Sequence, residues 1–111
     1  MEDDRFKLRE ISKNISNDFS IAGIDSLISK NDFESLNEFK IYLTEKIKSM
    51  MDTKFDKLIN TLYLIDVNED KLKDLFDTKN REFIPPKLAD LIIERQLQKF
   101  QIRQKYKRGE L

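Results

Sequence analysis

The sequence contains neither cysteine nor histidine, and it has only two glycines and two prolines in 111 residues. Without cysteine the chain has no disulfides and no thiolate metal ligands. Without histidine it has no imidazole base, no Ser–His or Cys–His nucleophile arrangement and no histidine-rich metal site. A β-rich fold would need turn residues every ~8–12 positions, which the few glycines and prolines do not provide. These absences predict a helical, non-catalytic protein.

Long apolar runs and export signals are also missing. Nowhere do the ~18 consecutive apolar residues of a membrane helix occur. Residues 1–4 are mostly acidic, whereas a secretory signal begins with basic residues and continues with an apolar run. We therefore expect a cytoplasmic protein with no membrane contact.

Charged residues make up 38% of the chain and hydrophobic residues 39%, which indicates a folded core inside a heavily charged surface. A chain of this length supports one core, because two cores would each bury too little apolar surface. We therefore expect a single helical domain over residues 1–111.

Apolar residues recur at intervals of three and four in five segments: residues 4–17, 33–50, 53–65, 68–76 and 86–105. This spacing predicts amphipathic helices. Candidate N-terminal caps are Asn31 and Asp32, Thr53, and Asn68. The pattern of residues 19–28 predicts a turn followed by a short helix. The pattern does not decide whether the helices before and after Asp52 are continuous. The fold class is thus all-α, a four- or five-helix bundle with a long C-terminal helix that begins near Pro86.

The predicted core consists of the apolar residues that share one face of each helix. Its members are Phe39, Leu43, Ile47, Leu58, Leu62, Leu72, Leu88 and Ile92.

The last helix has two apolar faces at ~100° per residue. Leu88, Leu91, Ile92, Ile102 and Tyr106 form one face, and Ala89, Ile93, Leu97 and Phe100 form the other. Either the helix lies between other helices of its own domain, or one face meets a second chain. The second reading makes Ile93, Leu97 and Phe100 the candidate interface of a homodimer. In the opposing interpretation a segment of the same chain folds back over this stripe and covers it. Its apolar residues are Phe19, Ile21, Ile24, Leu27 and Ile28.

The C-terminal segment is basic. Residues 95–111 hold six basic residues and one acidic residue, a net charge of +5, so residues 1–94 carry −5 in a chain that is neutral overall. Arg103, Lys105, Lys107 and Arg108 are candidate phosphate contacts, and Tyr106 could stack on a base. The opposing reading is that cations at a helix C-terminus stabilise the helix dipole, with residues 103–111 as a frayed tail.

Residues 66–77 partly match a calcium-binding EF-hand loop. Asp66, Asn68 and Asp70 occupy its first three ligand positions, but Lys71 stands where the loop requires glycine and Asp77 where it requires glutamate. We interpret the segment as an interhelix turn capped by Asn68, and no metal or cofactor is expected. No pair of carboxylates stands out for acid–base chemistry either, which leaves a small carboxylate-dependent enzyme as a distant third hypothesis.

Residues 55–59, 62–67, 71–73 and 89–99 together resemble a group of short, uncharacterised bacterial helical proteins. The resemblance covers roughly the C-terminal half and implies a bacterial cytoplasmic setting, but no activity, cofactor or partner. The function expected from the sequence is therefore a small interaction or regulatory module that self-associates through its C-terminal helix. The alternative is an accessory nucleic-acid-binding protein that uses the basic tail.

Overall fold

The computed structural model describes residues 2–21, 33–107 and 109 of the chain. Over these residues it contains five α-helices, one short 3-10 helix and no strand. The elements are α1 (Glu2–Ile21), α2 (Leu36–Thr53), α3 (Phe55–Ile65), α4 (Glu69–Phe76), η1 (Arg81–Phe83) and α5 (Ile84–Lys107). The all-α prediction with a long C-terminal helix is confirmed, and α5 has 24 residues.

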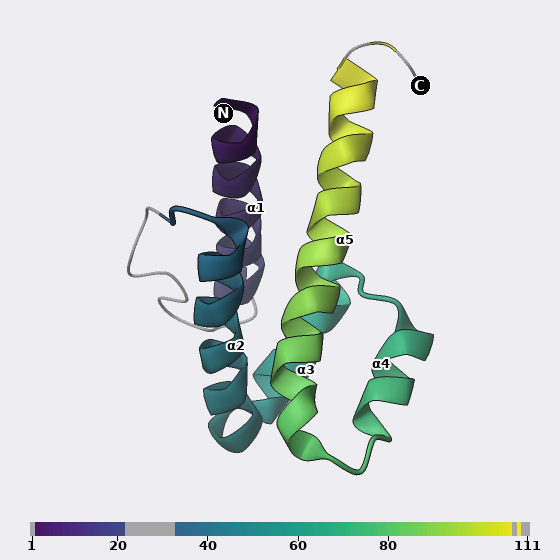
Figure 1. Cartoon of the computed structure of the whole chain (residues 1–111). Coiled ribbons are helices and arrows are strands. Elements are labelled where there is room, and N and C mark those ends of the chain that lie inside the picture. The colour runs from purple at the N-terminus through teal and green to yellow at the C-terminus, as the bar shows by residue number, and fades with distance from the viewer. Residues whose placement is uncertain (1, 22–32, 108, 110–111) are drawn as a thin grey trace.

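The helices pack around α5, which contacts α1, α2, α3, α4 and η1. As Figure 1 shows, α5 runs antiparallel to α1 and α2, so its C-terminal end lies at the same end of the molecule as the start of α1. α4 stands beside the first half of α5, at the opposite end from that tip. The molecule is elongated, with principal extents of 43 × 30 × 24 Å.

The core is continuous through all the long helices. Of the eight predicted core residues, seven are at most 1% exposed, whereas Leu72 is only half-buried at the edge of the core. The correction at Leu72 follows from the position of α4, whose residues include none that is fully buried. α1 adds a stripe beyond that prediction, made of Leu8, Ile11, Ile15 and Phe19.

The start of α2 differs from the prediction. The proposed caps Asn31 and Asp32 lie outside the described residues, and the helix begins after Ser35, whose side chain accepts a hydrogen bond from the Glu38 backbone N–H at 3.1 Å. Ser35 and Glu38 have the spacing of a capping box. Phe33, two residues before the cap, contacts the ring of Phe39 with centroids 5.1 Å apart and so packs the entering chain against the helix.

The break between α2 and α3 lies at Lys54, where the backbone leaves the helical region at φ −142°. Thr53 is therefore the last residue of α2 and not the cap of α3, and its hydroxyl donates to the Ser49 carbonyl at 2.9 Å. Asn68 does cap α4, because its side-chain oxygen accepts from the Lys71 backbone N–H at 3.0 Å. Pro85 and Pro86 lie in the first turn of α5, where proline is tolerated.

α1 is longer than predicted. Its helix continues through Phe19 to Ile21, so the turn expected to begin at residue 19 is wrong at its start. Phe19 is 0% exposed, and its burial in the core explains why the helix extends that far. The rest of that prediction, residues 22–28, lies outside the described residues.

Among the described helices, none combines the length and the apolar composition that crossing a bilayer requires.

Candidate functional site

The first half of α5 is buried on more than one side. Its buried residues are Ile84, Pro85, Leu88, Ala89, Ile92, Ile93 and Gln96. Residues of both apolar faces appear in this set, as expected for a helix that lies between other helices of its own domain.

The candidate interface stripe lies against α1 within the chain. Ile93 is 5% exposed, and Leu97 and Phe100 are half-buried. The ring of Phe100 contacts that of Phe6 at a centroid distance of 6.0 Å. The remaining surface of Leu97 lines a hollow of about 550 Å³ between α1 and the start of α2. α1 thus covers part of the stripe. The opposing interpretation gave this role to the segment from Phe19 to Ile28, of which residues 19–21 belong to α1 and residues 22–28 lie outside the described residues.

The opposite face of α5 is uncovered toward its end. Ile102 is 53% exposed and Tyr106 is 75% exposed, although both share a face with the buried Leu88 and Ile92. At ~100° per residue, Ile102 and Tyr106 point within about 20° of the direction of Arg95. We call Ile102 and Tyr106 the distal stripe.

Basic side chains surround the distal stripe. Arg103, Lys105 and Lys107 are all exposed, and no ion pair involves them in the described part of the chain. Arg108, the fourth candidate phosphate contact, lies outside the described residues. Residues 103–107 are helical, and the N–H of Gly109 donates to the Tyr106 carbonyl at 3.0 Å where the helix ends.

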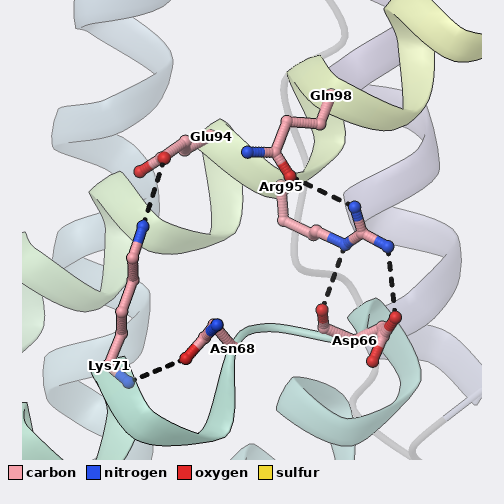
Figure 2. Close-up of polar contacts among 6 residues, drawn as sticks. All are labelled: Asp66, Asn68, Lys71, Glu94, Arg95 and Gln98. Atoms are coloured by element: carbon pink, nitrogen blue, oxygen red, sulfur yellow. Dashed lines mark hydrogen bonds and ion pairs between the residues drawn. The ribbon is translucent and has the colours of Figure 1, made fainter.

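The distal stripe begins where a polar clasp joins the α3–α4 turn to α5 (Figure 2). Arg95 donates from Nε to the Asp66 carbonyl at 3.0 Å and from Nη2 to Asp66 Oδ2 at 3.1 Å, while Nη1 donates to Gln98 Oε1 at 3.1 Å. Asp66 has the left-handed conformation, φ 65°, and its N–H donates to the carbonyls of Leu62 and Tyr63, which ends α3. The guanidinium therefore fixes a helix C-cap in place.

A second contact lies on the other side of the same turn. Lys71 Nζ and Glu94 Oε1 are 3.5 Å apart, and both side chains are about half exposed. Together with Leu91 and Asn68 they line a small cavity of about 100 Å³. Asp66 and Asn68 of the partial calcium loop thus act as a clasp partner and as a helix cap. No group of three acidic side chains suited to a metal ion occurs among the described residues.

A buried polar pair joins α1 to α5. Gln96 is 2% exposed, and its Nε2 donates to Asp18 Oδ2 at 2.9 Å. Burial raises the pKa of Asp18, and the opposing effects of Lys99 and of the Gln96 hydrogen bond are smaller. This pair could not be predicted from the sequence, because the contact depends on how α1 crosses α5.

Comparison with protein-family models, with curated proteins and with solved structures finds no match to this chain. The similarity to short bacterial helical proteins is therefore untested by these comparisons.

Proposed function

We propose that the protein is a non-catalytic interaction module of the cytoplasm that self-associates through the distal part of α5. The observation that carries this proposal is the distal stripe. Ile102 and Tyr106 continue a face that is buried in the first half of α5, and they remain 53% and 75% exposed. A second chain would cover them as the α3–α4 turn covers Leu91 and Arg95 earlier on the same face.

The interface residues predicted from the sequence lie outside this surface. Ile93 is only 5% exposed, so its burial is almost complete within one chain. Leu97 and Phe100 retain partial exposure on the opposite side of the helix from the distal stripe. The proposed interface is therefore centred on Ile102 and Tyr106, and Leu97 and Phe100 lie outside it.

Sedimentation at several protein concentrations tests the proposal. We expect the wild-type chain to dimerise and Ile102→Glu with Tyr106→Glu to remain monomeric, because charge at the centre of an interface is costly to desolvate. The matched control is Ile41→Glu on α2, which is 59% exposed and should leave association unchanged. A wild-type chain that is monomeric at every concentration would contradict the proposal.

The alternative function is binding of nucleic acid by the basic end of α5. The observation that favours it is the exposure of Arg103, Lys105 and Lys107 around Tyr106. Such binding would be weak and insensitive to sequence, because counterion release drives it, and it would fall steeply with added salt. Titration of a fluorescent oligonucleotide against the wild-type chain and a variant with all three cations changed to glutamine measures it. Equal binding by the two proteins would exclude the basic end as the contact.

A further inference from the structure

The charges on the surface of α5 and its neighbours are segregated along the helix. The basic end carries Lys105 and Lys107. The α3–α4 turn carries Asp66 and continues into Glu69 and Asp70 of the first turn of α4, a segment that we call the acidic turn, and all five side chains are exposed. Arg95 holds this turn against the middle of α5. Because Lys107 follows Arg95 by 12 positions on the same helix, the basic end and the acidic turn are separated by about 18 Å along its axis.

From this arrangement we infer that the partner of the distal stripe is a second copy of the chain in antiparallel orientation, with each basic end on the other copy's acidic turn. The inference rests on the self-association proposed above and adds its geometry. A two-fold axis beside Gln101, midway between Arg95 and Lys107, brings the two Ile102 side chains together near the axis. The same rotation brings Lys107 of each copy to the level of Arg95 of the other, whose guanidinium is already paired with Asp66, so that Lys105 and Lys107 approach the exposed Glu69 and Asp70.

A parallel pairing of the same stripes is disfavoured by charge. It would place Lys105 and Lys107 beside the identical residues of the second copy, and like charges opposed across an interface are repulsive. The antiparallel pairing separates the two basic ends and gives each an acidic neighbour. In this geometry the apolar stripe supplies the contact area, and the charges select its orientation.

The acidic turn has a local role as well. Glu69 and Asp70 lie in the first turn of α4, where the helix dipole favours acidic side chains. Neither forms an ion pair among the residues that the structure describes. Their charges are therefore available to a second copy, while Asp66 already accepts from Arg95 on its own chain.

Two charge-reversed variants test the inference. The first carries Lys105→Glu and Lys107→Glu, and the second carries Glu69→Lys and Asp70→Lys. Each variant alone opposes like charges at both ends of the dimer, so we expect its association to be roughly tenfold weaker than that of wild type, or weaker still. An equimolar mixture opposes unlike charges at both ends, and we expect association to return to the wild-type level.

The matched control carries Lys13→Glu and Lys48→Glu, two exposed positions on α1 and α2 that give the same change in net charge as the basic-end variant. It should associate like wild type. Sedimentation velocity in low salt measures all samples, and circular dichroism verifies that each variant is folded. If the reversal at Glu69 and Asp70 unfolds α4, the neutral variant E69Q with D70N replaces it and should still associate more weakly than wild type.

The outcomes separate the two proposals. Recovery in the mixture alone supports the antiparallel geometry. A wild-type dimer whose basic-end variant associates normally, or whose variants do not recover on mixing, overturns the geometry and leaves self-association standing. A wild-type chain that never associates overturns both.

Discussion

Leu43 of α2 and Leu62 of α3 lie in the centre of the core, with 0% and 1% of their surface exposed. Changing either to alanine removes buried methyl groups and leaves a cavity that the surrounding helices fill only partly. We expect each substitution to lower the free energy of unfolding by about 2–5 kcal/mol. A domain of this size is stable by about 5–15 kcal/mol, so each change would remove a large share of the total.

Two further leucines calibrate the measurement. Leu64 lies on the same helix as Leu62 but is 44% exposed, so Leu64→Ala should cost less than about 1 kcal/mol. Leu72 on α4 is half-buried, and Leu72→Ala should fall between these limits. The four substitutions remove the same atoms, so differences among them report burial and not chemistry.

Urea unfolding followed by circular dichroism gives the free energies, provided that the slope with denaturant is unchanged from wild type. The core assignment would be refuted if Leu43→Ala and Leu62→Ala left the midpoint in place. It would also fail if Leu64→Ala cost as much as Leu62→Ala, because burial would then not govern the loss.

Other predictions concern the polar contacts. Because burial raises the pKa of Asp18 above its ordinary value of 3.8, this residue favours the folded state most at low pH, and its contribution is lost as the pH rises through the raised value. Asp18→Asn keeps an acceptor for Gln96 but has no charge to bury. Its free energy of unfolding, measured by urea titration, should therefore rise relative to that of wild type between pH 3 and pH 7. A difference in free energy that stays constant over this pH range would contradict the prediction. Arg95→Ala should raise amide hydrogen exchange at the start of α4 more than in α2, because Asp66 loses both contacts. A calorimetric titration should show no saturable calcium binding at residues 66–77, and micromolar binding abolished by Asp66→Ala would disprove that expectation.

The periodicity of the sequence was sufficient to predict the helices and most of the core. Phe39, Leu43 and Ile47 recur at helical spacing, and this pattern alone places them on one buried face. The start of α2 was predicted less well, because Asn31, Asp32 and Ser35 are all good caps and local sequence does not choose among them. In the structure the helix begins at Ser35, with the ring of Phe33 packed on Phe39.

The covered face of α5 could not be predicted from the sequence for a different reason. Periodicity shows that the helix has two apolar faces, but it does not show which neighbour reaches which turn. α1 reaches one face through the contact of Phe6 with Phe100, and α3 ends at Ile65, next to the Asp66 that Arg95 contacts seven residues before Ile102. Which helix covers each face of α5 depends on helix lengths and crossing directions, and these are properties of the assembled fold.

The basic and the apolar residues at the end of α5 differ in whether a role within one chain accounts for their presence. Lys105 and Lys107 lie in the last turn, where cations stabilise the helix dipole, so their presence requires no partner. Ile102 and Tyr106 have no such explanation, because they are poorer helix formers than the glutamines and lysines beside them and they bury little surface in the chain. Single exposed apolar residues are ordinary, but these two lie together on the face that carries the buried Leu88 and Ile92, beyond the Arg95 clasp. The apolar residues therefore argue for a protein partner more strongly than the cations argue for nucleic acid, which is why self-association is the function proposed first.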